Sequence, residues 1–227
     1  MKVHMLQFPK KQPKLSIVLG DIPIGIFCLL LRFHPADMDK PTLFDQFVAK
    51  KVKMSMPNLA ILAADEAIPA TRWHMLCYDQ QDASVAFRAA WVLEYIATHY
   101  PERFVPVFMD FLLRLPSQGN PSCQRHFTKI LMLITHAKAP ERYRDLYLRA
   151  DRERLVETIF GWLIEPQTPV AVQVNCLDIL FNMTPEFPWI KDELKQQTEF
   201  FLRDGSAAMQ SRGKKILAKL KKVKIAG

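Results

Sequence analysis

The feature that most constrains this chain is a segment pattern that returns three times. The segments "FRAAWVLEYIATHYPE", "QRHFTKILMLITHAKAPE" and "VQVNCLDILFNMTPE" each run through an apolar stripe to a Pro-Glu pair. Their prolines, Pro101, Pro140 and Pro185, lie 39 and 45 positions apart. Apolar residues at helical spacing, followed by a proline, predict a helix and its end. The chain therefore repeats one helical unit, and "SRGKKILAKLKK" begins a fourth, truncated copy.

A second apolar helix is predicted between successive copies, over residues 104–115, 152–164 and 189–202. Helix starts are indicated at Asp82 or Ser84, at Asn120 with Pro121, at Thr168 with Pro169, and at Ser206. Arg88, Arg125 and Arg212 come near the start of their copies, whereas the third copy has Gln173 there. We interpret Arg88 as a structural residue that reaches an acidic neighbour or a carbonyl at a helix end.

Two helices in a unit of about 40 to 47 residues are typical of HEAT and armadillo repeats. Residues 82–222 resemble a HEAT-like (armadillo-type) α-solenoid protein of the small kind found in bacteria. The resemblance implies an all-α fold, a right-handed α-solenoid of HEAT-like helix pairs. The expected organisation is an extension over residues 1–37 that is poorly ordered or not native, helices over residues 38–81 that cap the array, and repeats over residues 82–227 ending in a basic helix.

The stretch "FRAAWVLEY" fits the core-facing side of the first repeated helix. Phe87, Ala90, Trp91, Glu94 and Tyr95 fall at the spacing of a wide helical stripe. The pattern therefore predicts that Trp91 is largely buried against neighbouring helices.

Composition supports helices and a reducing compartment. The chain has 16 prolines and only 7 glycines, and it contains neither GxGxxG nor GxxxxGK[ST]. Its four cysteines, Cys28, Cys77, Cys123 and Cys176, are widely spaced without a CxxC, which favours buried thiols in a cytoplasmic protein over a disulfide framework. The apolar run near the amino terminus is interrupted by Asp21 and Pro23, so no integral membrane span is expected.

The positive charge of the chain lies at its two ends. Residues 54–202 carry 14 basic and 18 acidic side chains, whereas residues 203–227 carry 8 and 1. In the last helix, Ile216, Leu217, Leu220 and Val223 form an apolar stripe beside a cationic face. A second candidate segment, "ERYRDLYLRADRER", interleaves five arginines with two tyrosines but also holds four acidic residues. The residues that could bind an anionic partner are Lys214, Lys215, Lys219, Lys221, Lys222, Arg142, Arg144 and Arg149. A solvated end cap and a salt-bridged helix face are the alternatives for these two segments.

Catalytic and metal-ligating patterns are weak. His74 with Cys77, and Cys123 with His126, are each three positions apart, but neither pair belongs to a known zinc pattern. No catalytic residue, metal or cofactor is predicted. The leading hypothesis is a non-enzymatic scaffold or adaptor whose second helices bind a protein partner. The alternative is nucleic-acid binding, similar to HEAT-like alkylpurine DNA glycosylases, with Trp73, Trp91, Trp162 and Trp189 as the available aromatic residues.

Overall fold

The computed structural model describes residues 41–222, which contain helices and no β-strand. The predicted all-α class is therefore confirmed for this part of the chain. The α-helices are α2 (Leu43–Val48), α3 (Met56–Ala64), α4 (Ala70–Leu76), α5 (Ala83–His99), α6 (Pro101–Phe104), α7 (Phe108–Arg114), α8 (Pro121–Thr135), α9 (Glu141–Arg149), α10 (Arg152–Ile164), α11 (Val170–Met183), α12 (Ile190–Phe201) and α13 (Ala207–Leu220), and the 3₁₀ turns are η2 (Val105–Val107) and η3 (Leu115–Ser117). None of these helices is long and apolar enough to cross a bilayer.

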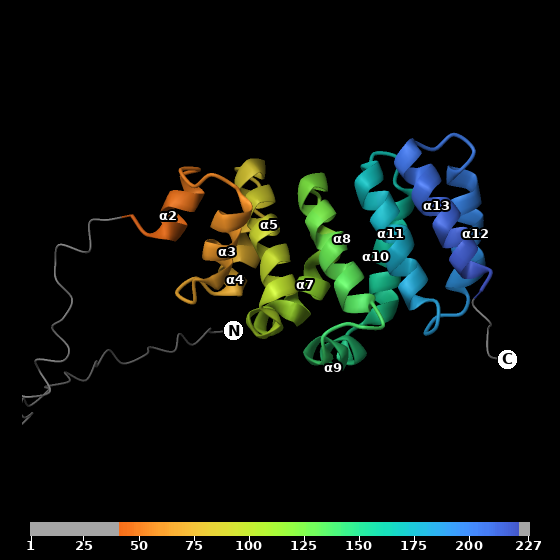
Figure 1. Ribbon diagram of the computed structural model, residues 1–227, viewed down its shortest axis with the longest axis horizontal. Coiled ribbons are helices and arrows are strands. Elements are labelled where there is room, and N and C mark those ends of the chain that lie inside the picture. Colours follow the sequence, from red (N-terminus) through yellow and green to blue (C-terminus); the bar gives the residue numbers. More distant parts are fainter. Residues whose placement is uncertain (1–40, 223–227) are drawn as a thin grey trace, which may run out of the picture. The chain divides into compact units, whose positions relative to one another are not determined.

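The helices of residues 42–222 form two layers that follow the order of the chain (Figure 1). In the first layer α3, α5, α8, α11 and α13 each pack against the next. In the second layer α4 packs against η2, and η3 packs against α10, so α4, the α6–α7 segment and α10 are also neighbours. Each unit therefore contributes one helix to each layer, as expected for a solenoid of helix pairs.

Most of the predicted helix starts are correct because polar caps satisfy the first backbone N–H groups. The side chain of Asp82 accepts hydrogen bonds from the N–H groups of Ser84 and Val85. Asn120 and Ser206 cap α8 and α13 in the same way. Thr168 is the exception, since α11 starts after Pro169 without a side-chain cap and Thr168 is buried.

One second helix differs from its expected form, and a separate short helix precedes another. Residues 104–115 do not form one continuous helix, because Pro106 has no N–H to donate and the segment is divided into α6, η2 and α7. Residues 141–149 form the separate helix α9, which packs against α6 and α8. The Tyr143 hydroxyl anchors α9 by donating to the Ala97 carbonyl at 2.7 Å.

The core-facing side of α5 is only partly the predicted one, because Ala90 of the predicted stripe is buried while its four other members are half-buried. The buried face consists mainly of small and aliphatic residues, among them Ala86, Ala89, Ala90 and Leu93. Trp91 is only half-buried, and its ring stacks on His126 of α8 with centroids 6.0 Å apart. The small alanine side chains let neighbouring helices approach α5 closely on several sides. The aromatic rings of α5 itself, Phe87, Trp91 and Tyr95, therefore lie at the margin of the core.

Side chains from a following unit bind the carbonyl groups at the ends of preceding helices. Arg88 donates to the carbonyls of Phe47, at 3.3 Å, and Val52, which confirms its predicted structural role. Arg103 donates to the carbonyls of Asp65 and Ile68 beyond α3, at 2.7 and 2.8 Å. Three glutamines do the same in later units: Gln124 to Gln118, Gln173 to Leu163 and Gln210 to Leu202.

These glutamines correct the repeat alignment by one residue. Gln173 corresponds to Gln124 rather than to Arg125, and Arg125 is exposed. Two residues after each glutamine stands a side chain that reaches back to the preceding first helix. His126 contacts Glu94, Asn175 donates to Thr128, and Arg212 pairs with Asp178.

Several sequence-based expectations fall on residues outside the described range. They include the extension over residues 1–37, Cys28 and Val223. Within the range, the apolar stripe of α13 is confirmed, since Ile216 and Leu220 are buried and Leu217 is half-buried. At the other end of the repeats, Trp73 of α4 is fully buried and packs on Phe47 with ring centroids 4.8 Å apart.

The two arginines Arg88 and Arg125 provide a test of the corrected alignment. Replacing Arg88 with Met keeps the apolar stem but leaves the carbonyls of Phe47 and Val52 without this donor, so we expect a loss of about 1 to 3 kcal/mol in the free energy of unfolding. The control Arg125→Met changes an exposed side chain and should have little effect. Urea denaturation measures both variants, and equal losses would contradict the assignment.

Candidate functional site

Exposed apolar side chains are more frequent in the second layer than in the first. Among the described residues, the second-layer helices α4, α7, α10 and α12 bear five large apolar side chains that are at least 44% exposed: Met75, Met109, Leu113, Ile164 and Phe200. In the first layer, only α3 bears side chains of this kind, Met56 and Ile61. Exposed apolar groups that gather on one surface, rather than singly, are typical of interaction sites. We call the part of this layer formed by α4, α7 and α10 the second-helix surface.

Three pockets lie along the second-helix surface. The α4–α7 pocket has a volume of about 460 Å³, the α7–α10 pocket about 350 Å³, and the η3 pocket about 590 Å³. The α4–α7 pocket is lined by Phe44, Arg72, Met75, Leu76, Tyr78, Asp79 and Arg114. The α7–α10 pocket is lined by Met109, Asp110, Leu112, Leu113, Ala150, Asp151, Arg154 and Leu155.

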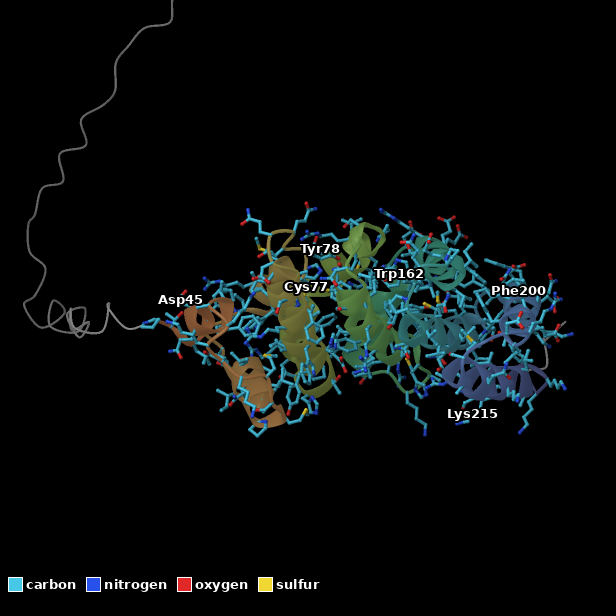
Figure 2. All side chains as sticks on the ribbon, turned by 90° about the horizontal axis from the view of Figure 1, so that it is seen from above. Asp45, Cys77, Tyr78, Trp162, Phe200 and Lys215 are labelled. Carbon is cyan, nitrogen blue, oxygen red and sulfur yellow. The ribbon has the colours of Figure 1, made fainter. Side chains whose placement is uncertain are left out.

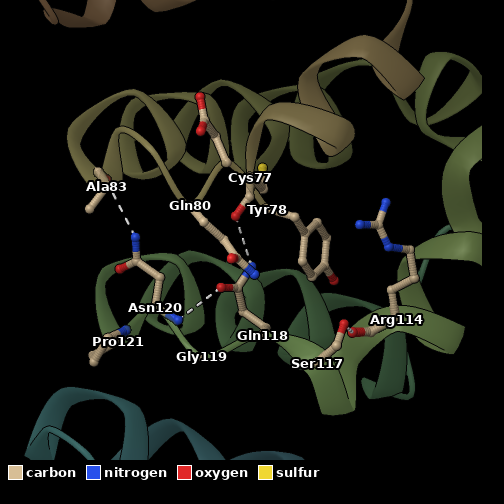
Figure 3. A pocket seen from close by; sticks show the side chains of 11 residues that line it. Cys77, Tyr78, Gln80, Ala83, Arg114, Ser117, Gln118, Gly119, Asn120 and Pro121 are labelled. Carbon is tan, nitrogen blue, oxygen red and sulfur yellow. Dashed lines mark hydrogen bonds between the residues drawn. The ribbon is translucent and has the colours of Figure 1, made fainter.

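The η3 pocket joins the end of α4 to the start of α8 (Figure 3). Gln118 closes its floor by donating to the carbonyl of Cys77 at 3.0 Å. Asn120, the cap of α8, donates to the carbonyl of Ala83 at 3.3 Å. Its polar lining groups are therefore largely committed to holding the two units together.

Arg114 stands at the centre of the second-helix surface. It lines both the α4–α7 and the η3 pockets, and its guanidinium carbon lies 3.9 Å from the centroid of the Tyr78 ring. Figure 3 shows the two side chains beside each other. Its ion pair with Asp110 is long, at 4.0 Å. The guanidinium is thus held in place by an aromatic face while its charge remains available.

A buried histidine lies below this surface. The Nδ1 of His74 is 3.1 Å from an Asp110 carboxylate oxygen, and its ring is surrounded by Tyr78, Phe111 and Phe127. Burial lowers the pKa of His74 from 6.5 to about 4, against the opposing attraction of Asp110. At neutral pH the ring is therefore neutral and donates one hydrogen bond to Asp110.

The thiols do not form a reactive centre. Cys77, Cys123 and Cys176 are free and buried. Burial raises the pKa of Cys123 to about 12 and raises those of Cys77 and Cys176 as well, so these thiols stay protonated. Within residues 41–222, no group of three histidine, cysteine or acidic side chains is placed to hold a metal ion.

The basic residues predicted to bind an anion lie on two separate helices. Lys214, Lys215, Lys221 and Lys222 are exposed on or just after α13, which packs against α11 and α12. Lys219 is partly engaged, 3.5 Å from a carboxylate oxygen of Asp178. Arg142, Arg144 and Arg149 are exposed on α9, which packs against α6 and α8. Figure 2 shows Lys215 on the side of the molecule opposite Tyr78.

The four tryptophans do not share one surface. Trp73 and Trp162 are buried, and Trp91 is half-buried between its neighbours. Trp189 is 57% exposed and stacks on Phe160, with ring centroids 5.8 Å apart. A groove with several converging tryptophans is therefore not present among the described residues.

The residues of the second-helix surface were missed from sequence because they do not belong to a motif. Met75, Met109 and Leu113 lie within segments predicted to be helical, but their positions lie outside the buried faces of α4 and α7. One signal was available in the sequence. In α4 and α7 the apolar residues cover more of the helix surface than one buried face requires, which indicates that some of them are exposed.

The comparisons with known proteins agree with the helix pairs described above. A family model described as a HEAT repeat domain matches residues 51–220. No curated protein and no solved structure matches the chain.

The lowered pKa of His74 predicts a pH dependence of stability. Between about pH 6.5 and 4 the unfolded chain binds a proton that the folded chain excludes, so stability should fall as the pH decreases through this range, by about 2 to 3 kcal/mol in all. His74→Gln should reduce this slope, and His136→Gln, which alters an exposed side chain, should not. The stability should be measured by urea denaturation between pH 7 and 5. Because the pKa of Glu94 is lowered, this carboxylate stays ionised in the folded protein throughout that range and does not contribute to the slope. An unchanged slope in His74→Gln would contradict the assignment.

Proposed function

Because the chain belongs to the HEAT repeat domain family, we propose that it is a non-enzymatic scaffold or adaptor that binds a protein partner through its second-helix surface. Helical repeat proteins expose extended surfaces built from one layer of their helices. In this chain the second layer supplies that surface, since α4, α7 and α10 line its apolar pockets.

The observation that carries the proposal is the exposure of apolar side chains beside preformed pockets. Met75 is 67% exposed and borders the α4–α7 pocket, while Met109 and Leu113 are 44% and 59% exposed and border the α7–α10 pocket. Covering such side chains with a partner removes apolar area from water, at about 25 cal/mol per Å². Methionine also adapts its shape to different partners.

Three finer points belong to the same proposal. The superhelix is right-handed, and the helices over residues 38–81 cap its amino-terminal end. The protein acts in the cytoplasm, a placement that is supported by the free, buried thiols of Cys77, Cys123 and Cys176.

A second candidate function is nucleic-acid binding through α13. Lys214, Lys215, Lys221 and Lys222 are exposed, so their charges are available to phosphates. The buried stripe of Met209, Gly213, Ile216 and Leu220 holds the helix against α11 and α12 while these lysines face solvent. Arg142, Arg144 and Arg149 lie on α9, which packs against other helices, and they form a second candidate site for phosphates.

Changing two apolar residues of the second-helix surface tests the leading proposal. Met109→Ser with Leu113→Ser should abolish capture of a specific protein from native cell extract, with nuclease present, because both side chains border the α7–α10 pocket. The matched control is Met56→Ser with Ile61→Ser on α3, where both residues are 58% exposed. Both variants should keep the melting temperature within a few degrees. Equal capture by the wild type and the Met109/Leu113 variant would refute this surface as the binding site.

A salt series tests the nucleic-acid alternative. Replacing Lys214, Lys215, Lys219, Lys221 and Lys222 with Gln preserves the apolar stripe and removes the phosphate contacts. If these lysines bind duplex DNA, each lost contact should reduce the slope of log K against log salt by about 0.9. A wild-type protein without salt-dependent binding at low ionic strength would exclude this alternative. Equal binding by the variant would direct attention to Arg142, Arg144 and Arg149.

A further inference from the structure

We propose that the outward side of the first layer binds the phosphate backbone of a nucleic acid that runs from α13 across α11 to α8. We call this side the first-helix surface. Its cations are Arg125, Lys129, Arg212, Lys215, Lys219 and Lys222. The inference rests on the second candidate function, nucleic-acid binding through α13, and extends that site over three helices. It leaves the second-helix surface to a protein partner.

The two layers of helices differ in charge. The second-layer helices α4, α7, α10 and α12 contain six lysine or arginine residues and six acidic residues. The first-layer helices α3, α5, α8, α11 and α13 contain seven basic residues of this kind and only two acidic residues. Of these seven, Arg88 is buried and the others reach solvent. The first layer therefore presents an excess of positive charge, which the second layer lacks.

Both acidic residues of the first layer lie beneath cations. Glu94 accepts from the Nζ of Lys129 at 3.0 Å, and its side chain is 19% exposed whereas that of Lys129 is 44% exposed. Asp178 is 11% exposed and pairs with Arg212 and Lys219, which are 37% and 51% exposed. Each carboxylate is thus neutralised by a cation that reaches further into solvent. The charge that a ligand meets first is positive.

Helix geometry and ion pairs place these cations on one side of the layer. Four of them, in and just after α13, recur at intervals of three or four residues and so share one side of that helix: Arg212, Lys215, Lys219 and Lys222. Contacts with Asp178 hold Arg212 and Lys219 against α11. On α8, Arg125 and Lys129 are exposed one turn apart. Figure 2 shows Lys215 opposite Tyr78, which lines pockets of the second layer.

The first-helix surface is too long for a small anion. α8 packs against α11, and α11 packs against α13. Packed helices lie about 8 to 10 Å apart, so the cations of α8 and α13 are separated by roughly 20 Å. Between them, Asn175 and Asn182 of α11 are half-buried polar groups. A nucleic acid can meet cations at both ends, since duplex DNA carries about one negative charge per 1.7 Å of its axis.

The same surface lacks apolar groups for other anionic partners. Neither α8 nor α13 bears an exposed large apolar side chain, and the apolar stripe of α13 is buried. Protein interfaces are built around an apolar core and are poor in lysine, and helices that bind membranes insert an apolar face. Phosphate contacts require only cations and polar donors. A nucleic acid therefore fits this surface better than an acidic protein or a membrane.

Binding of the full-length protein to a mixed-sequence DNA duplex, and to one of its single strands, tests the inference across a salt series. R125Q/K215Q removes one cation from α8 and one from α13. For the duplex, it should reduce the slope of log K against log salt by about 1.8, and R125Q alone by about 0.9, because each phosphate contact contributes about 0.9. The matched control K195Q/R203Q changes an exposed lysine of α12 and an exposed arginine just after it, and it should bind as the wild type does.

The two double variants have the same net charge, and equal melting temperatures show that the fold is retained. The inference is overturned if the wild type shows no salt-dependent binding to either form of DNA, or if the control loses as much as R125Q/K215Q. Polyglutamate that competes equally well would assign the surface to acidic proteins and overturn it too. Binding that depends on Lys215 but not on Arg125 would refute the extension to α8 and retain the α13 candidate. Protein capture through Met109 and Leu113 is measured separately, so the leading proposal stands or fails independently.

Discussion

The structure depends on how helix ends are satisfied between successive units. A helix leaves its last carbonyl groups without internal partners, and many proteins end helices with a glycine at positive φ. Within residues 41–222 no glycine has a positive φ. Instead Arg88, Gln124, Gln173 and Gln210 supply N–H donors to carbonyls at or just beyond the ends of preceding helices. Each unit thus completes the preceding one, which couples local helix formation to the stacking of the array.

The two layers of helices differ in the contacts that join successive units. In the first layer, polar pairs such as Asn175 with Thr128 and Asn182 with Thr135 connect α11 to α8. Both pairs join residues 47 positions apart, so the two helices run parallel and in register. The second layer is instead interrupted by proline at Pro106 and carries exposed apolar residues beside pockets. The polar pairs of the first layer therefore hold successive units in register, and the second layer holds the surface that we propose for partner binding.

The candidate surface could be predicted only in outline. The expectation that second helices form the binding face relied on the geometry of solenoids in general, but no motif indicated Arg72, Arg114 or Arg154. Their positions within the helices differ, and only the packing of α4, α7 and α10 brings them to one series of pockets. The basic residues of α9 and α13, which the sequence did indicate, lie on helices that pack against different neighbours.

The sequence by itself determined the helical class, the repeat and most helix boundaries, because apolar spacing, proline and polar caps act within a few residues. It did not determine for every helix which side faces the core. In α5 the pattern favoured Trp91, which is half-buried, whereas Ala86 and Ala89 outside the predicted stripe are buried because neighbouring helices approach from several directions. The same is true of Gln124 and Gln173, whose roles depend on carbonyls in the preceding unit. Contacts between distant residues are set by the stacking of the helices, and only the tertiary structure decided them.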